Sequence, residues 1–551
     1  MQIHRTYRTL RNYTNGWVIA SLIGAAAILL PILYVMSGLF RPVNENWATV
    51  KTYLLTDYVI GSAKLVLLTG FFSTLAGVFL AWLVVGYAFP LRRFFRWGLV
   101  LPLAVPPYIA AYTYGTMTSY TGIIQATLRN QFNIQLPHGM MELSSLRGAV
   151  FTLSVFLFPY VFLLMRTYLE RQSGSYIENG RLLGRSGWGL FTRVVLPLSR
   201  PAIIAGAMLV IFEVLSDYGV ASYFGVQTIS TAIFQTWFGM YDIDSAMRLA
   251  AWLLVIIIGI FILERLLRQG RRYGAMSSRS KPLQPVQLKG WAAAGATGLC
   301  ILVFSAGFLV PVGQILLWAT WTYSSVWRSD FVDLLRNTLT GAAWATLVVM
   351  GIAVLSAKSV RMVSNAGAYA LARLMTAGYA IPGAIIAIGA LAVFIGLDEL
   401  LSPLYVWLLD REEGALVLSL SLPMLLAGYV IRFMATGYNA IEAGYDKIPR
   451  TYTEAAQSLG HKQGSTFRRV ELPLLKPAIL SGFALTFIEI VKELPLTLLL
   501  RPFNFDTLAT RTYQYAIDER IYEAALPSLL LIMLSLISVI IVLRLEKGRI
   551  R

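Results

Sequence analysis

Two stretches of this 551-residue chain decide its fold: YIENGRLLGRSGWGLFTRVVLPLSRPAI, from Tyr176, and YTEAAQSLGHKQGSTFRRVELPLLKPAI, from Tyr452. They align without a gap at an offset of 276 residues, and 13 of the 28 positions are identical. The likeness continues into the following residues, where Glu213 matches Glu489. Because the offset is half the chain length, the repeat predicts two homologous halves.

The composition around the repeat is typical of a membrane protein. Hydrophobic residues make up 57% of the chain and charged residues only 13%, against about 25% charged in soluble domains. Too few charges remain to cover several soluble cores, and so high a hydrophobic content excludes intrinsic disorder. A single cysteine, Cys300, excludes a disulfide scaffold. We therefore predict an all-α, polytopic membrane protein.

Apolar stretches of the length needed to cross a bilayer, about 20 residues, predict about 12 transmembrane helices, six in each half. In the first half they lie near 17–39, 59–86, 97–118, 149–168, 202–224 and 247–267, and in the second near 291–319, 338–356, 368–396, 414–434, 478–500 and 524–544. An even number of spans gives both halves the same orientation. A pseudo-twofold axis along the membrane normal should therefore relate them.

The basic residues predict the orientation. With both termini in the cytoplasm, 33 of the 46 Lys and Arg residues fall on the cytoplasmic side, in agreement with the positive-inside rule. The net charge of +18 then reflects topology, and we expect no nucleic-acid partner. The predicted organisation is a first half (1–270) with a loop near 173–201, a cytoplasmic linker (271–290) and a second half (291–551) with a loop near 449–477.

Each repeated loop is predicted to form a short helix, a break and a second helical stretch that leads into the next span. In the second copy Thr453 can cap a helix opening at Glu454, and Gly460 stands where that helix should stop. Ala455 and Ala456 would let another surface approach closely. Such a helix suits docking into a groove of a partner protein; the alternative is a solvated loop.

The second loop resembles the EAA loop of ABC-importer permeases. The residues that carry the match are Glu454, Ala455, Ala456, Gly460, Leu472 and Pro473. The first loop is a degenerate copy that keeps Glu178, Gly184, Leu196 and Pro197. Asn179 and Gly180 replace its two alanines. The resemblance implies that each loop forms a coupling helix in a cleft of a cytoplasmic ATPase subunit, two of which, with their ATP and Mg, would drive one chain.

The segments that follow the two loops carry a narrower resemblance. Residues 212–226 and 491–529 are similar to fused ferric-iron importer permeases, as is the layout of twelve spans in two halves. That resemblance implies a type I ABC-importer permease fold in a bacterial inner membrane. It also implies ferric iron as cargo, delivered by a periplasmic or lipid-anchored binding protein. Fused permeases for thiamine, phosphonate-type compounds and polyamines share much of this layout, so those cargoes stay open.

Ionisable residues inside the predicted spans form a second group of candidates for the translocation pathway. They are Glu213, Asp217, Glu489, Lys492 and Glu493. Asp217 and Glu493 are also 276 residues apart, so two carboxylates recur in each half, and each pair would share one helix face. Pro495, just after the second pair, predicts a break in its span.

These acids allow two interpretations. Charges inside a bilayer are costly and mark functional sites by default, and ferric iron, as a hard cation, would favour a path lined by oxygen ligands. Alternatively the acids are structural, with Lys492 neutralising a neighbour and the carboxylates bonded to helix ends or loop amides. We favour the structural interpretation, because a permease has to release its cargo.

Other functions find less support. The chain lacks the G-x-x-x-x-G-K-[ST] pattern, so we expect a transport subunit that binds no cofactor of its own and leaves ATP hydrolysis to its partners. The sequence contains neither H-E-x-x-H nor G-x-S-x-G, the motifs that would indicate a membrane-embedded enzyme. His4, His138 and His461 lack metal-ligand spacing. An ion-coupled secondary transporter could use the buried acids, but it has no need of paired docking loops.

Overall fold

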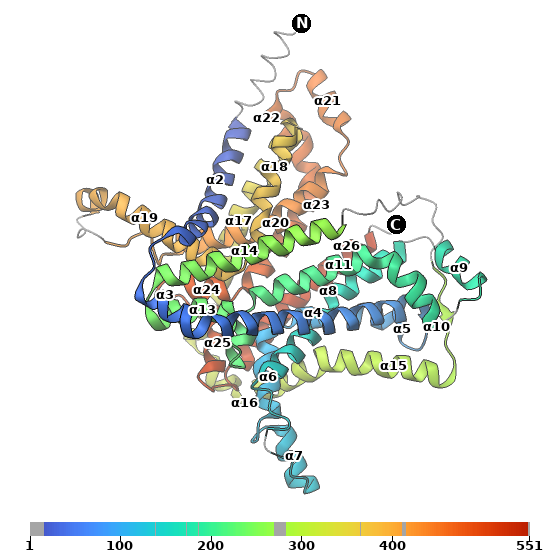
Figure 1. The fold of residues 1–551 in the computed structure, drawn as a ribbon. Coiled ribbons are helices and arrows are strands. Elements are labelled where there is room, and N and C mark those ends of the chain that lie inside the picture. Colours follow the sequence, from blue (N-terminus) through green and yellow to red (C-terminus); the bar gives the residue numbers. More distant parts are fainter. Residues whose placement is uncertain are drawn as a thin grey trace. The chain divides into compact units, whose positions relative to one another are not determined.

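The chain is built almost entirely of helices, as the apolar stretches predict (Figure 1). The computed structural model describes residues 16–137, 139–171, 174–185, 187–268, 283–363, 365–409 and 415–548. Most of the predicted linker, together with His4 and His138, lies outside these residues. Strand pairing among the described residues is limited to β1 (Tyr87–Ala88) and β2 (Val286–Gln287), which run parallel. The all-α prediction is confirmed.

The chain divides into two compact units, and each takes helices from both halves of the sequence. Unit 1 comprises Met1–Val43, Thr236–Leu254 and Arg328–Thr510, and unit 2 comprises Asn44–Gln235, Val255–Trp327 and Arg511–Arg551. The compact units therefore have other bounds than the sequence halves.

Unit 1 contains the second loop. Its helices are α2 (Gly16–Ser37), η1 (Gly38–Phe40), α17 (Ser329–Val363), α18 (Ala366–Met375), η7 (Thr376–Ala380), α19 (Gly383–Leu409), α20 (Leu422–Tyr445), α21 (Arg450–Ser458), α22 (Gln463–Thr466), η8 (Phe467–Glu471), α23 (Leu472–Val491) and α24 (Pro495–Leu500). Three helices pass from one unit into the other, namely η5 (Gln235–Gly239), α14 (Ile243–Arg268) and α25 (Leu508–Ile517).

Unit 2 contains the first loop. Its helices are α3 (Glu45–Thr49), η2 (Val50–Leu54), α4 (Leu55–Gly86), α5 (Arg92–Gly98), η3 (Leu101–Ala104), α6 (Pro107–Thr118), α7 (Ile123–Phe132), α8 (Leu146–Arg171), α9 (Gly174–Leu182), α10 (Gly187–Leu190), η4 (Phe191–Val195), α11 (Leu196–Ser216), α12 (Gly219–Tyr223), α13 (Ile229–Phe234), α15 (Gly290–Phe304), η6 (Ser305–Leu309), α16 (Val310–Val326) and α26 (Ala525–Gly548).

The described residues provide nine helices that are long and apolar enough to cross a membrane, or ten if one bent pair counts as a span. The shorter apolar helix Ala525–Ile541 and the more polar α20 correspond to the two remaining predicted spans. Each of the twelve predicted apolar stretches therefore corresponds to a helix or to helices separated by a short break, and the polytopic membrane prediction is confirmed.

Several of the predicted spans are not continuous. The stretch 97–118 is bent by 89° between Arg92–Ala104 and Pro107–Phe132, and 368–396 is interrupted before α19 at Ile381 and Pro382. Each break lies at a proline, which lacks a backbone N–H and disfavours helix in the residue before it.

The predicted span 414–434 is displaced along the chain. The helix there, α20, starts only at Leu422, because two amides just before it are hydrogen-bonded to a side chain and not to helix carbonyls. Leu418 and Ser419 donate their amides to the buried carboxylate of Asp398 at 2.9 and 2.8 Å. These bonds satisfy amides that would otherwise belong to the first turn of a longer helix.

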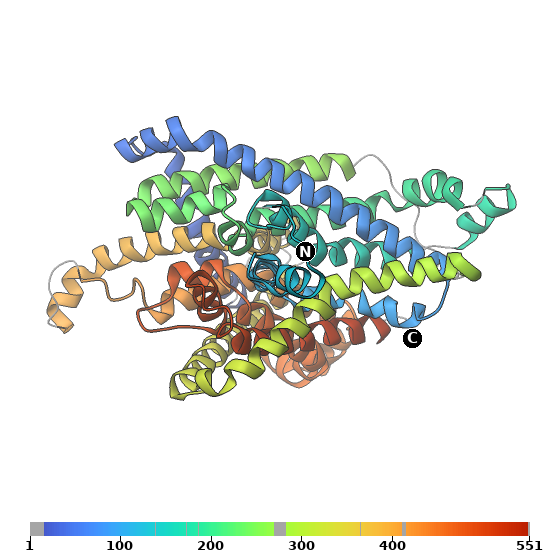
Figure 2. The ribbon, with the colours of Figure 1, turned by 90° about the horizontal axis from the view of Figure 1, so that it is seen from below.

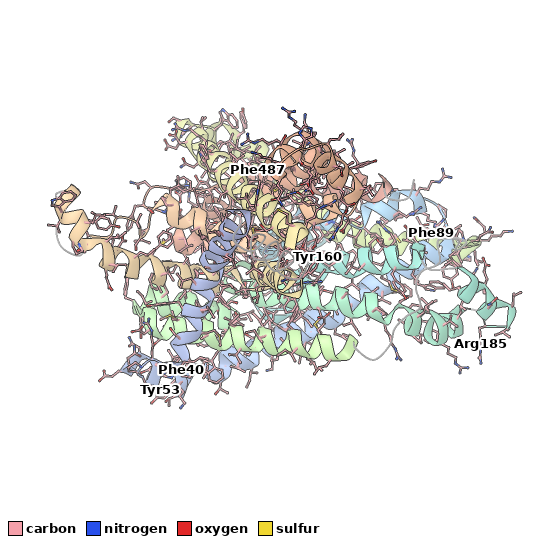
Figure 3. The ribbon with its side chains drawn as sticks, turned by 90° about the horizontal axis from the view of Figure 1, so that it is seen from above. Phe40, Tyr53, Phe89, Tyr160, Arg185 and Phe487 are labelled. Atoms are coloured by element: carbon pink, nitrogen blue, oxygen red, sulfur yellow. The ribbon has the colours of Figure 1, made fainter. Side chains whose placement is uncertain are left out.

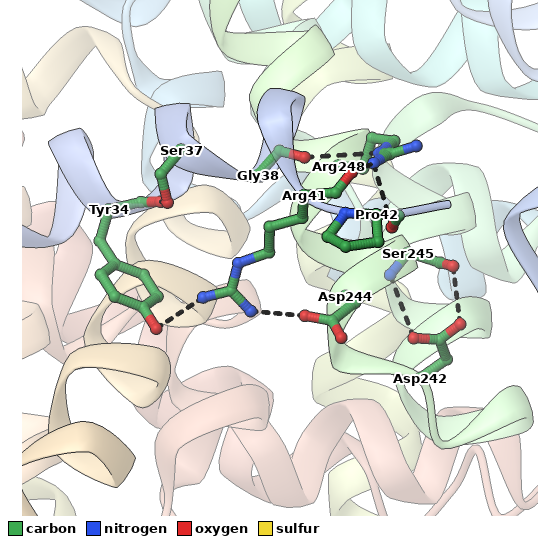
Figure 4. A network of polar contacts seen from close by, with 9 residues as sticks. All are labelled: Tyr34, Ser37, Gly38, Arg41, Pro42, Asp242, Asp244, Ser245 and Arg248. Carbon is green, nitrogen blue, oxygen red and sulfur yellow. Dashed lines mark hydrogen bonds and ion pairs between the residues drawn. The ribbon is translucent and has the colours of Figure 1, made fainter. Parts of the chain in front are cut away.

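A polar network fixes the end of α2 within unit 1 (Figure 4). Arg41 pairs with Asp244 at the start of α14 (2.5 Å) and donates to the hydroxyl of Tyr34 (2.6 Å). Arg248, one turn further along α14, donates to the carbonyl of Gly38 (3.4 Å). Since α2 also packs against α17, α18 and α19, the first helix of the chain belongs to a bundle made mainly of second-half residues.

The same helix trio forms the centre of each unit. In unit 2, α4, α8 and α11 lie side by side, and in unit 1 the equivalent trio is α17, α20 and α23 (Figures 1 and 2). Glycines at equivalent repeat positions let the helices approach. A Cβ on Gly206 would lie 2.8 Å from the Cα of Val161, and one on Gly482 would lie 2.8 Å from the Cβ of Ala440.

A second pair of contacts supports the 276-residue offset in three dimensions. Ser62 on α4 accepts a hydrogen bond from the amide of Ile229, and Thr338 on α17 accepts one from the amide of Leu508, both at 2.8 Å. Ser62 and Thr338 are 276 residues apart. The two units are therefore built on one plan, as the repeat predicts.

Candidate functional site

In the second repeated loop the docking candidate is a helix, α21. It starts directly after Pro449, whose backbone (φ −55°, ψ 140°) is outside the helical region. The prediction that Thr453 caps a helix opening at Glu454 is therefore wrong, because both residues lie inside α21. Proline restricts its own φ and has no N–H to contribute, so it marks the start of the helix more strongly than a threonine does.

The end of α21 agrees with the prediction made for Gly460. This residue has a left-handed backbone (φ +85°), and its amide donates to the carbonyl of Gln457 at 3.0 Å. The amide of His461 donates to the carbonyl of Ala456 at 3.1 Å. These two bonds form a Schellman motif, which satisfies the last carbonyls of a helix and requires a residue that tolerates positive φ.

The first loop closes its helix, α9, in the same way. Gly184 has φ +77°, and its amide donates to the carbonyl of Arg181 at 3.0 Å. The amide of Arg185 donates to the carbonyl of Gly180, also at 3.0 Å. Arg185 lies at the outer edge of this loop (Figure 3). The loop that is degenerate in sequence therefore keeps the backbone geometry of the other.

Both loops expose a leucine at the end of their short helix. Leu183 and Leu459, at the ends of α9 and α21, are 82% and 81% exposed. Glu454 and Ala455 are exposed as well, and Glu178 is half-buried. The leucine was not among the candidates chosen from the sequence; the available signal is that it recurs beside the glycine in both copies. A helix end that presents an apolar side chain in this way is suited to contact another protein.

The missing alanine of the first loop has a steric explanation. A Cβ on Gly180 would lie 2.9 Å from Leu190 and 3.3 Å from Val194. In the second loop the residue equivalent to Gly180 is Ala456, which is buried, and the residue equivalent to Leu190 is Thr466. The first loop thus combines a smaller residue in the helix with a larger packing residue, and the second loop the reverse, so the two differences offset each other in volume.

The Leu-Pro pairs mark where each loop passes into a long helix. Leu196 and Pro197 open α11 and are half-buried, whereas Leu472 and Pro473 open α23 and are exposed. A π-helical turn, η4 or η8, precedes each pair. Proline is favoured in the first turn of a helix, where its missing N–H costs nothing. The predicted order of short helix, break and helical stretch is present in both loops.

Two of the intramembrane acids, Asp217 and Glu493, lie at breaks in the helices that follow the loops. Asp217 comes directly after α11, and its carboxylate accepts the amides of Ala221 (3.0 Å) and Val220 (3.5 Å) at the start of α12. Glu493 lies between α23 and α24 and accepts the amide of Leu496 at 3.1 Å. The spans 202–224 and 478–500 are therefore not continuous helices.

The break predicted from Pro495 is present, since this residue opens α24. The prediction that each pair of acids shares one face of a single helix is wrong, because Asp217 and Glu493 lie beyond the helix ends.

The other two acids have partners on their own side of each break. Glu489 pairs with Lys492 one turn later at 2.8 Å, with both side chains about a quarter exposed. Glu213 accepts a hydrogen bond from the hydroxyl of Tyr160 on α8 at 3.5 Å, within unit 2. Across the described residues, no group of three or more His, Cys, Asp or Glu side chains could hold a metal ion.

The chain matches a known protein family twice. Residues 73–272 and 348–551 both match the family described as binding-protein-dependent transport system inner membrane component. The two matches start at equivalent positions of the repeat, to within one residue, and together they cover well over half of the chain.

Relatives extend this similarity over nearly the full length. The chain is 25% identical over 525 residues to the Fe(3+)-transport system permease protein FbpB 2 of Haemophilus influenzae, which covers 92% of this chain and 93% of that protein. It is 32% identical over 161 residues to the molybdenum transport system permease protein ModB of Escherichia coli, covering 29% of this chain and 68% of ModB. It is 26% identical over 216 residues to the E. coli sulfate transport system permease protein CysT, covering 38% and 74%.

Proposed function

We propose which solute this chain transports and which subunits supply the energy for transport. The chain belongs to the family of binding-protein-dependent transport system inner membrane components. It is a permease of the ABC-importer type. Its cargo is ferric iron, which a periplasmic or lipid-anchored binding protein hands over on the outer side of the inner membrane. The support for iron is the similarity, over 92% of the chain, to a relative named as an Fe(3+) transport permease.

The drive comes from two ATPase subunits that dock on α9 and α21 at the cytoplasmic side. They bind the ATP and Mg and carry out hydrolysis, while this chain supplies the path. The observation that carries this assignment is that both loops present an exposed leucine, Leu183 and Leu459, next to a glycine of positive φ. Two copies of one docking element on one chain fit two copies of one partner.

The intramembrane acids hold the broken helices and do not bind iron. Asp217 and Glu493 each accept amides of the helix that follows, and Glu489 is neutralised by Lys492. Capping of this kind satisfies amides that the bilayer offers no water to satisfy. A pathway without strong ligands also suits release, since cargo held tightly would not leave.

The cargo is tested with the chain reconstituted in liposomes together with its ATPase and binding protein. We expect ATP-dependent uptake of ferric iron that requires the loaded binding protein. Molybdate and sulfate are the matched competitors, because permeases for molybdenum and sulfate are similar to parts of this chain. Uptake of either oxyanion, or of thiamine, phosphonates or polyamines, in place of iron would overturn the cargo and leave the importer assignment standing.

A further inference from the structure

A buried carboxylate lies directly beneath α21. Glu471, the last residue of η8, is 0% exposed and accepts two hydrogen bonds from the ammonium of Lys358 on α17, at 2.7 and 2.8 Å. It also accepts the hydroxyl of Tyr445 at the end of α20 and the hydroxyl of Thr453 on α21, both at 3.1 Å. One carboxylate therefore joins four helices of unit 1.

A second side chain of α17 holds the turn between α20 and α21. Arg361 donates to the carbonyls of Tyr445 (2.9 Å) and Ile448 (2.8 Å), and its guanidinium lies 4.8 Å from the centre of the Tyr445 ring. The same turn borders a cavity of about 270 Å³. The polar contacts from α17 therefore hold the turn that leads to Pro449 and the start of α21.

The equivalent positions of the other unit are all apolar. The residues 276 positions before Lys358, Tyr445, Thr453 and Glu471 are Trp82, Leu169, Ile177 and Val195. All four are buried, and all belong to the hydrophobic core of unit 2. The fold therefore needs no ionic group beneath a loop of this kind.

An ion pair that the fold does not require is costly to bury. Taking two charges out of water is offset only by good geometry and further hydrogen bonds, and apolar residues of similar volume can replace such a pair without loss of stability. The ion pair and its hydrogen bonds are directional, so they hold defined atoms of the neighbouring helices at defined distances. Apolar contacts are not directional, so helices packed by them can shift relative to one another.

We propose that Glu471 and Lys358 are positioning residues that transmit movement of α21 to α17 and α20, so that the second loop is rigidly connected to the transport helices and the first is not. The inference rests on the proposed function, in which an ATPase moves α21. Thr453 lies on α21, so its hydroxyl connects the docking helix directly to the buried pair.

The test uses the complete transporter in liposomes and measures cargo moved per ATP hydrolysed. Thr453→Val removes the connection but leaves the Lys358–Glu471 pair intact, and Thr453→Ser is the matched control that keeps the hydroxyl. We expect Thr453→Val to lower the ratio about tenfold, as the loss of a hydrogen bond to a charged group implies, while Thr453→Ser stays near the unmodified value.

A second variant separates positioning from folding. The double replacement Lys358→Leu with Glu471→Val copies the apolar character of the other unit, so the protein should fold and bind its ATPase. The proposal expects it to hydrolyse ATP with the same lowered ratio as Thr453→Val.

An unchanged ratio in Thr453→Val or in the double variant would overturn the proposal. So would loss of hydrolysis and transport in equal proportion, because that result would make the network a purely structural support. If the unmodified chain binds no ATPase at all, the proposed function fails instead, and the two failures are therefore distinguishable.

Discussion

α9 and α21 end with the same pair of hydrogen bonds around a left-handed glycine, yet they rest on different supports. Beneath α21 lies the ion pair of Lys358 and Glu471, whereas the equivalent residues, Trp82 and Val195, are buried in the hydrophobic core of unit 2. The backbone motif is kept because it defines the surface offered to a partner. The support can be ionic or apolar, because either fills the volume below.

The largest effect that separates the two supports should come from removing one charge. Glu471→Ala leaves the ammonium of Lys358 buried without its partner, which costs about 3–5 kcal/mol. The matched variant in the other unit, Val195→Ala, removes only buried methyl groups and should cost about 1–2 kcal/mol. The measurement is the thermal unfolding of each purified variant in detergent. Equal losses in both variants would show that the ion pair is no more critical than the apolar contact.

A smaller effect should follow from exchanging the packing beneath the two helices. Gly180→Ala places a Cβ 2.9 Å from Leu190, and overpacking of this kind costs about 1–3 kcal/mol. Adding Leu190→Thr copies the pair formed by Ala456 and Thr466 and should recover part of that loss.

A double-mutant cycle on the unfolding transition measures the coupling between these two positions. If the two changes simply add, size compensation does not explain the degenerate first loop.

The smallest effect concerns the acids at the helix breaks. Asp217→Ala removes the cap of α12 and should cost about 1 kcal/mol, whereas Asp217→Asn keeps one oxygen that can accept the amide of Ala221, the shorter of the two bonds. Transport by Asp217→Asn and Glu493→Gln should therefore stay near normal at equal protein levels. Loss of iron uptake in well-folded Asp217→Asn would instead support a carboxylate-lined path.

Two parts of this architecture can be predicted from the sequence. Bilayer thickness sets the length of the apolar stretches, which predicts the helices that span the membrane. Gly184 and Gly460 predict where the short helices end, because glycine tolerates the positive φ that the structure shows there. The breaks in the spans are harder to locate. Pro495 marks one of them, but at Asp217 the chain leaves the helix without a proline, and its side chain then caps α12.

The ion pair beneath α21 could not be predicted from local sequence. Lys358 follows a predicted span and is read as a positive-inside residue, and its partner lies 113 positions away. A signal does exist in the repeat, since both positions become charged in the same copy while their equivalents, Trp82 and Val195, are apolar. Comparing equivalent positions of the two halves therefore identifies candidate ion pairs that the sequence of one half alone does not reveal.

The central claim is that one chain offers two docking helices to an ATPase, and native mass spectrometry of the purified complex tests it most directly. We expect two ATPase subunits per chain, reduced by Leu183→Asp or Leu459→Asp and unaffected by Lys51→Ala, an exposed residue outside both loops. A complex with no ATPase, or one whose composition is unchanged when both leucines are replaced, would contradict the account.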